Sequence, residues 1–125
     1  MPTLREIMSS DVFEVDPDAP VSEVAAMMVR RRFGSAVVKR SNMVAGIFTE
    51  RDVLRAAASG ADLTSSPVRS WMTEDPVTAR PDTDSEDAAQ TMLSGGFRHL
   101  PVEEGTELVG IVSLRDVLSA RIGRS

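Results

Sequence analysis

The fold of this chain is decided by residues 46–54, GIFTERDVL, which recur as residues 110–118, GIVSLRDVL. The match extends outward from this stretch at a constant offset of 64, so that residues 5–56 align with residues 69–120 without a gap. In that alignment 16 of the 52 positions are identical, and the identities concentrate in one run, which similar composition alone does not produce. The sequence therefore carries an internal duplication, and we expect two copies of one small structural unit.

The lengths of the chain and of its copies limit how they can fold. A chain of 125 residues has the size of one ordinary domain, but either copy alone would bury too little of its surface to be comfortably stable. We therefore expect the copies to share a core. We place repeat 1 at residues 1–60, a polar linker at 61–67 and repeat 2 at 68–125.

Composition and charge exclude several classes of protein. The content of 42% hydrophobic and 26% charged residues is typical of a soluble globular protein, and the longest apolar run, residues 43–48, is far too short to cross a membrane. The absence of cysteine excludes disulfides and thiolate chemistry and is compatible with the cytoplasm, where we expect the protein to act. A single histidine, His99, leaves no imidazole cluster for a metal. The net charge of −5 disfavours nucleic acid as a partner, because Lys and Arg supply most of the affinity for phosphates.

Each copy predicts the same order of elements: a short helical lead-in, a strand, a helix, two strands and a second helix. In copy one we expect a strand at 12–15, a helix from residue 21 that Gly34 ends, strands at 36–38 and 44–48 joined through 40–42, and a helix at 50–59. Copy two repeats this plan at 77–79, 84–94, 99–103, 108–113 and 114–122. The first helix of copy one carries an apolar face that we expect to be buried: Val21, Val24, Ala25, Met28 and Val29. The fold class predicted is α+β, with two β-α-β-β-α repeats.

The pattern Gly-x-x-Thr/Ser-x-x-Asp stands at each predicted junction between strand and helix, as Gly46, Thr49 and Asp52 and again as Gly110, Ser113 and Asp116. One interpretation is a capping box, in which the hydroxyl and the carboxylate satisfy backbone groups of the helix and add about 1 kcal/mol of stability. The other is a ligand site, because a helix N-terminus attracts phosphate and a neighbouring carboxylate accepts hydrogen bonds from a sugar diol. The glycines leave room for a flat ring or an adjoining strand, or they mark a bend in the strand.

With further motifs, these junctions resemble the tandem pair of cystathionine-β-synthase (CBS) domains known as a Bateman module. In copy one the resemblance is carried by Met8, residues 21–28 (VSEVAAMM) and residues 44–52 (VAGIFTERD). In copy two it is carried by Met72, residues 98–102 (RHLPV) and residues 108–116 (LVGIVSLRD), so that it covers nearly the whole chain. It implies two units packed sheet against sheet about a pseudo-twofold axis, with two equivalent clefts for adenosine-containing ligands such as AMP, ADP, ATP, S-adenosylmethionine or NAD.

The resemblance also implies which residues contact the ligand. Phosphate and ribose would be bound by Thr49 and Asp52 in one cleft and by Ser113 and Asp116 in the other. Adenine would lie against the first strand and the segment after the first helix, at Val12, Phe13, Ser35 and Ala36 in copy one and at Val77, His99 and Leu100 in copy two. In similar proteins a basic pair reaches the phosphates of the opposite copy, and Arg98 and His99 occupy that position. Copy one has Gly34 and Ser35 there, so only the Thr49/Asp52 cleft would gain cationic help; the alternative for Arg98 and His99 is a strand start that faces solvent.

Three classes of function can be weighed on these residues. The resemblance implies a regulatory module that senses an adenine nucleotide, has no obligatory cofactor and acts through an unknown effector protein. The alternative is a purely structural dimerisation module in which the aspartates only cap helices. Similar proteins commonly pair through their helices, so we expect a homodimer in either case, with Trp71, Phe97 and residues 56–58 as candidate surface, although Trp71 equally suits a core. We do not expect an enzyme, because one His and no Cys leave no nucleophile with an activating base.

Overall fold

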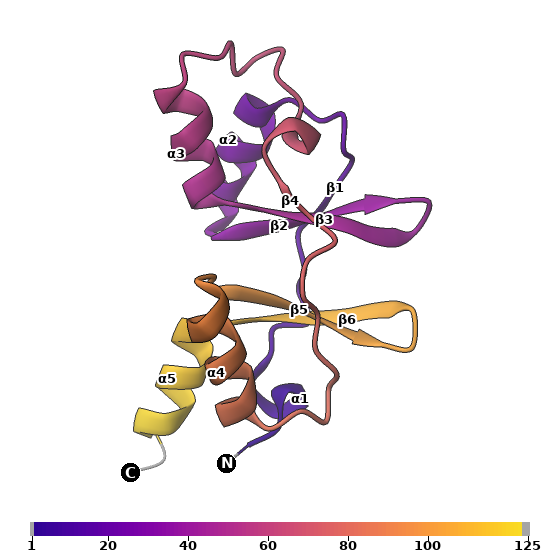
Figure 1. Ribbon diagram of the computed structural model, residues 1–125, viewed down its shortest axis with the longest axis vertical. Coiled ribbons are helices and arrows are strands. Elements are labelled where there is room, and N and C mark those ends of the chain that lie inside the picture. The colour runs from indigo at the N-terminus through magenta and orange to yellow at the C-terminus, as the bar shows by residue number, and fades with distance from the viewer. Residues whose placement is uncertain (1, 124–125) are drawn as a thin grey trace. The chain divides into compact units, whose positions relative to one another are not determined.

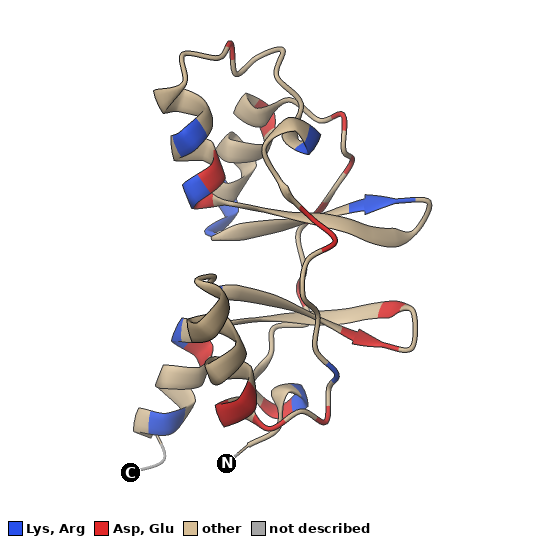
Figure 2. Cartoon of the chain, in the orientation of Figure 1, with Lys and Arg blue, Asp and Glu red and all other residues tan. Residues whose placement is uncertain are grey.

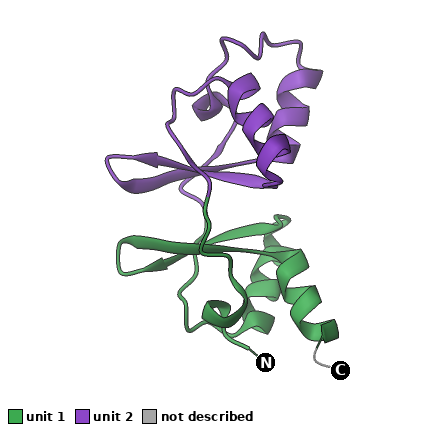
Figure 3. Cartoon of the chain, turned by 180° about the vertical axis from the view of Figure 1, so that it is seen from behind, with its two compact units in different colours: residues 1–12, 77–125 green, residues 13–76 purple. Residues whose placement is uncertain are grey.

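The computed structural model describes residues 2–123 and divides the chain into two compact units that do not coincide with the repeats of the sequence. Unit 2 comprises residues 13–76, and unit 1 comprises residues 1–12 together with 77–125 (Figure 3). The lead-in of copy one therefore belongs with the body of copy two. Reciprocally, residues 68–76, the lead-in of copy two, belong with the body of copy one.

Unit 2 contains a four-stranded sheet with two helices that contact each other and the sheet (Figure 1). Its elements are β1 Glu14–Val15, α2 Val21–Arg31, β2 Ser35–Arg40, β3 Met43–Thr49, α3 Glu50–Ala58, a short 3-10 helix η1 Val68–Ser70 and β4 Thr73–Glu74. The strand order is β1-β2-β3-β4. Strand β1 runs parallel to β2, whereas the other neighbouring pairs are antiparallel.

Unit 1 repeats this architecture with shorter edges. Its elements are α1 Leu4–Ile7, α4 Ser85–Gly95, β5 His99–Glu104, β6 Glu107–Ser113 and α5 Leu114–Gly123. Strands β5 and β6 pair antiparallel. Single bridges from Ala79 to Val102 and from Ser9 to Ile111 stand where β1 and β4 pair in unit 2, at registers that differ by the same offset of 64. The α+β class and the two repeated units that the sequence predicts are thus confirmed.

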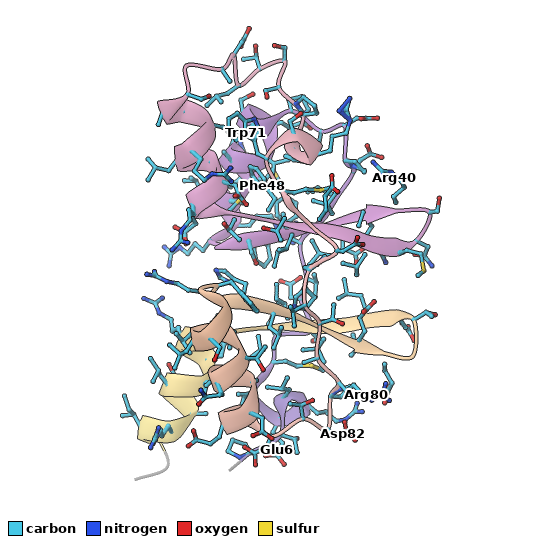
Figure 4. All side chains as sticks on the ribbon, in the orientation of Figure 1. Glu6, Arg40, Phe48, Trp71, Arg80 and Asp82 are labelled. Atoms are coloured by element: carbon cyan, nitrogen blue, oxygen red, sulfur yellow. The ribbon has the colours of Figure 1, made fainter. Side chains whose placement is uncertain are left out.

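Each unit has its own hydrophobic core, and each core contains residues of both copies. The unit 2 core consists of Val21, Val24, Met28, Ala36, Val38, Phe48, Ala56 and Val68. The unit 1 core consists of Leu4, Ala88, Met92, Leu100, Val102, Val112 and Val117. The expected single shared core is therefore replaced by two cores, to which the exchanged lead-ins contribute Leu4 and Val68. Trp71, labelled with the buried Phe48 in Figure 4, is partly buried against the unit 2 core, which supports the core interpretation of this residue.

The predicted hairpins form, and their turns explain the residues found there. Ser41 and Asn42 both have positive φ, 52° and 63°, as a two-residue turn with the right-handed twist of its strands requires. Gly105, with φ of 65°, occupies the corresponding turn of unit 1. The two hairpin ends carry opposite charge, Lys39–Arg40 in unit 2 and Glu103–Glu104 in unit 1 (Figure 2).

Four local predictions are wrong. The strand expected at 77–79 does not form, and only Ala79 pairs, in a single bridge. Val29 is 81% exposed, because it lies about 100° around α2 from Met28 and the buried face extends only over Val21, Val24 and Met28. Helix α2 is not ended by Gly34: its C-cap is Arg32, which has the left-handed φ of 61°. Only Glu14 and Val15 of the expected strand 12–15 are strand residues.

Candidate functional site

In unit 2, strand β3 brings Thr49 to the N-cap of α3 and places Asp52 in its first turn. The backbone N–H of Thr49 donates to Asp52 Oδ2 over 2.9 Å, and the Thr49 hydroxyl donates to the same oxygen over 3.3 Å. Asp52 is only 5% exposed, although it is a charged residue. The capping-box interpretation is therefore confirmed in this copy.

In unit 1, β6 and α5 form the equivalent junction. The backbone N–H of Ser113 donates to Asp116 Oδ2 over 2.8 Å, and the backbone N–H of Asp116 donates to the Ser113 hydroxyl oxygen over 3.0 Å. Asp116 is half-buried. Capping occupies one carboxylate oxygen in each copy, so it leaves acceptor capacity on the other oxygen and does not compete with binding of a ligand.

The second oxygen of Asp52 has a partner within unit 2. Arg55 Nη1 donates to Asp52 Oδ1 over 2.9 Å, and the same nitrogen lies 3.4 Å from the backbone oxygen of Trp71. The guanidinium carbon lies 5.6 Å from the centre of the Trp71 ring. The ring is held in turn by its Nε1, which donates to the Ser66 hydroxyl over 3.0 Å. Sequence reasoning missed Arg55, although its spacing of three residues from Asp52 is that of an ion pair along a helix.

The glycines of the two junctions are explained by the lead-in segments. A Cβ atom on Gly46 would lie 2.5 Å from Met72 Sδ and 2.8 Å from the backbone oxygen of Thr73. On Gly110 it would lie 2.6 Å from Met8 Sδ and 2.8 Å from the backbone oxygen of Ser9. Of the interpretations offered by the sequence, close approach of an adjoining strand is the one that the structure supports.

The residues expected to line an adenine in copy one meet at the same end of the unit 2 sheet as Thr49. Ser35 is the register partner of Thr49, and Ala36 follows it; both are buried. The backbone N–H of Val37 donates to the Phe13 oxygen over 2.8 Å, which fixes Phe13 beside β2. Val12, in contrast, is the last residue of the first segment of unit 1.

An aromatic stack beside Phe13 was not foreseen. The rings of Phe13 and Phe33 lie 5.5 Å apart at an interplanar angle of 17°, and the guanidinium carbon of Arg31 lies 4.9 Å from the centre of the Phe33 ring. The available signal was that Phe33 and Phe97 are identical in the alignment of the two copies. Copy two has no counterpart of the stack, because Val77 replaces Phe13.

The predicted contacts of copy two are arranged around the start of β5. His99 is the register partner of Ser113, and Leu100 is buried beside it. The Arg98 side chain is exposed, while its backbone oxygen accepts the N–H of Leu114 over 2.9 Å. Val77 is 51% exposed. Unit 1 therefore holds Arg98 and His99 together with Ser113 and Asp116, and their role toward a phosphate stays a prediction.

Two further properties concern the described part of the chain as a whole. Residues 2–123 contain no cluster of three or more His, Asp or Glu side chains arranged to hold a metal ion. None of the helices described has the length and apolar character needed to cross a bilayer.

Comparison with known proteins gives several matches. The model of the CBS domain family matches the chain twice, at residues 4–59 and 68–123. An uncharacterised 17.7 kDa protein of Acidianus ambivalens is 43% identical over 119 residues, which cover 94% of this chain and 71% of that protein. The crystal structure of a CBS-domain containing protein of Agrobacterium tumefaciens superposes with a TM-score of 0.89 at 34% identity, over 96% of this chain and 99% of the other. The CBS domain pair of protein MJ0100, solved in complex with 5′-methylthioadenosine and S-adenosyl-L-methionine, superposes with a TM-score of 0.91 at 20% identity, over 100% and 99% of the two chains.

These matches agree with the structure in their internal duplication. The two matched segments have the same offset of 64 as the two junctions, the two hairpins and the edge pairings of the two units. The repeated family match and the identity to the relative with a solved structure lead to one conclusion: this chain belongs to the CBS domain family and carries the domain as a tandem pair.

Proposed function

We propose that this chain is a regulatory module that binds adenosine-containing ligands of the AMP, ADP and ATP class and acts through a partner protein or a dimer surface. The observation that carries the proposal is the repeated junction, at which Asp52 and Asp116 each lie in the first turn of a helix with one carboxylate oxygen engaged by the cap. The positive end of the helix favours a phosphate, and a carboxylate beside it suits the diol of a ribose. The complex of protein MJ0100 with two adenosine compounds supports this ligand class.

The roles proposed for the other residues follow their places in the two units. Thr49 and Ser113 would orient the aspartates and contact phosphate, because they begin helices α3 and α5. Phe13, Ser35 and Ala36 in unit 2, and Val77, His99 and Leu100 in unit 1, would form the walls for adenine. We assign Val12 to the same role, and we assign Arg98 and His99 to the ligand phosphate. The ligand would act as an allosteric effector in the cytoplasm, with no obligatory cofactor and no chemical step.

Thermal unfolding with added ligand tests this proposal. AMP, ADP, ATP, S-adenosylmethionine and NAD would each be added to the purified chain, and a ligand at a hundred times its dissociation constant adds about 2.7 kcal/mol of stability. Asp52→Ala and Asp116→Ala should each lower the affinity measured by calorimetry, since a hydrogen bond to a charged acceptor contributes about 1.5–3 kcal/mol. The absence of a ligand-dependent shift for all five compounds would leave only the structural role of the aspartates as helix caps.

A second comparison examines the cationic contact. Arg98→Ala should lower the affinity for AMP more than the affinity for adenosine. A guanidinium binds phosphate through charge-assisted hydrogen bonds, and adenosine has no phosphate to make them. Arg80→Ala is the matched control, because Arg80 is another exposed arginine of unit 1. Its Nε atom lies 4.0 Å from Asp82 Oδ1. Equal loss of AMP affinity in both variants would reduce the role of Arg98 to its contribution to overall charge.

We propose further that the protein forms a homodimer through its helices. Large apolar side chains are exposed at positions related by the offset of 64: Val29 at 81% and Leu93 at 65%, and Leu54 at 70% and Leu118 at 50%. Exposure of the same apolar positions on both helix pairs is typical of a contact surface. Such a surface would also give a ligand-induced change a route to a partner protein.

A further inference from the structure

The two junctions share their capping geometry, but the environments of their aspartates differ in one contact. Both carboxylate oxygens of Asp52 accept hydrogen bonds within unit 2. The Thr49 backbone N–H donates to Oδ2, and Arg55 donates to Oδ1. The Asp52 side chain is 7% exposed, whereas the Arg55 side chain is 56% exposed. Arg55 is also held by the backbone oxygen and the ring face of Trp71. The acceptor expected to receive a ribose diol is therefore already occupied by a cation.

Copy two keeps the cap but lacks counterparts of Arg55 and Trp71, the two residues engaged beside Asp52 Oδ1. At the offset of 64, Ser119 stands in place of Arg55 and Ile7 in place of Trp71. Asp116 Oδ2 accepts the Ser113 N–H, and across residues 2–123 no hydrogen bond or ion pair reaches Asp116 Oδ1. With respect to these residues, Oδ1 of the half-buried Asp116 is therefore available to an incoming donor.

We propose that Arg55 is a specificity-determining residue that makes the two ligand sites unequal, with the contact between Arg55 and Asp52 competing against the ribose diol. The inference rests on the proposed binding of adenosine ligands. At Asp116 both diol hydroxyls can donate to an available carboxylate. At Asp52 the ligand has to displace the guanidinium from Oδ1 or share that oxygen with it. Discrimination between ribose and a sugar without hydroxyls is thus stronger at Asp116 than at Asp52.

The size of the effect follows from the exposure of Arg55. A half-exposed ion pair contributes at most about 1 kcal/mol to stability. That free energy corresponds to a factor of about five in a binding constant. The contacts to Trp71 favour this upper end, because they add a second set of attractions that keep the guanidinium beside Asp52. Replacing Arg55 by the serine of copy two should therefore raise the preference for ribose at Asp52 about fivefold.

The experiment compares AMP with 2′,3′-dideoxy-AMP by calorimetry. The two ligands carry the same base and phosphate, so the ratio of their affinities reports only the hydroxyl contacts. Asp116→Ala leaves the Asp52 site for measurement, and in this background Arg55→Ser should raise the AMP to dideoxy-AMP ratio about fivefold with little change for dideoxy-AMP. In the Asp52→Ala background, Ser119→Arg should lower the ratio at Asp116.

Matched variants separate this role from a loss of charge or of folding. Arg51→Ser removes an exposed arginine one turn earlier in α3 and should leave the ratio unchanged. Arg55→Lys keeps the charge and should keep the ratio near that of the parent. Circular dichroism of each variant confirms that it is folded. An unchanged or lower ratio in Arg55→Ser would overturn the inference while leaving the proposed function intact, whereas failure of the parent chain to bind AMP would overturn both.

Discussion

Met72 lies so close to Gly46 that a Cβ atom at residue 46 would come within 2.5 Å of its Sδ atom. The two residues belong to different copies of the duplication, and Met8 meets Gly110 in the same way in the other unit. The contact thus marks the exchange of lead-in segments between the copies. It also shows why glycine stands six residues before each aspartate: at Gly46 and Gly110 the strand passes close beside the side chain and backbone of the lead-in segment.

Gly46→Ala should therefore destabilise unit 2 by about 3 kcal/mol, the upper end of the cost of overpacking. Met72→Ala in the same chain should recover only part of the loss, because the backbone oxygen of Thr73 remains 2.8 Å from the new atom. Urea unfolding measures both effects. Gly60→Ala is the control: Gly60 has a φ of 80° but no atom within 4 Å, so only backbone strain of about 1 kcal/mol is expected.

Leu4→Ala should destabilise the unit that contains most of copy two. Leu4 is fully buried in the unit 1 core, so its truncation should cost about 2–5 kcal/mol. Hydrogen exchange should then accelerate in strands β5 and β6 more than in β2 and β3. Val68→Ala should produce the reverse pattern, because Val68 is buried in the unit 2 core. Faster exchange in β2 and β3 on changing Leu4 would contradict the exchange of lead-ins.

The ends of helices α2 and α4 offer a comparison between two residues in one conformation. Arg32 and Gly96, which are equivalent in the alignment, both have left-handed backbones with φ of 61° and 73°. Glycine accepts this conformation at little cost, whereas other residues are strained. Arg32→Gly should stabilise the protein by about 0.5–1 kcal/mol, and Gly96→Ala should destabilise it by about 1 kcal/mol. Equal effects of the same sign in thermal unfolding would show that backbone strain is not the cause.

The proposed homodimer depends on exposed leucines at equivalent positions of α3 and α5. Leu54→Glu together with Leu118→Glu should convert a dimer into a monomer, because both side chains are at least half exposed in the single chain and their apolar surface would be covered only by association. Light scattering at micromolar concentration measures the mass. Thr106→Glu, an exposed change in a hairpin turn, is the control for added negative charge and should leave the dimer intact. A monomer mass for the parent chain would count against the proposal.

The segment between the repeats contains a carboxylate with a shifted pKa. The pKa of Asp62 is lowered from its ordinary value, first by the hydrogen bond from the Thr64 hydroxyl and then by the bond from the Thr64 backbone N–H. A lowered pKa means that this turn is stabilised above the ordinary pKa of Asp and loses that contribution as the pH falls through the lowered value. Thr64→Val should move the Asp62 pKa upward in an NMR titration. An unchanged pKa would show that the hydroxyl bond has no influence.

Much of the local structure could be predicted from the sequence because it depends on neighbours in the chain. The hairpins follow from apolar runs separated by turn residues, and the capping boxes follow from a hydroxyl and a carboxylate three positions apart. The offset of 64 then transferred each assignment from one copy to the other. Val29 was wrongly placed in the core because periodicity gives the direction of a face but not its width, which is set by what packs against it.

The tertiary structure decided what depends on partners far apart in the chain. Residues 2–12 pack with 77–123, although nothing in their own pattern distinguishes the core of copy two from that of copy one. The state of the two aspartates was decided in the same way: Asp52 and Asp116 stand in the same motif, yet the contacts of Arg55 with Asp52 and with Trp71, 16 residues further on, close only the first carboxylate. A duplicated sequence determined by itself that two equivalent junctions exist. The two aspartates differ in their hydrogen-bond partners because folding brings different side chains beside them. A carboxylate accepts a hydrogen bond from any donor placed close enough to it.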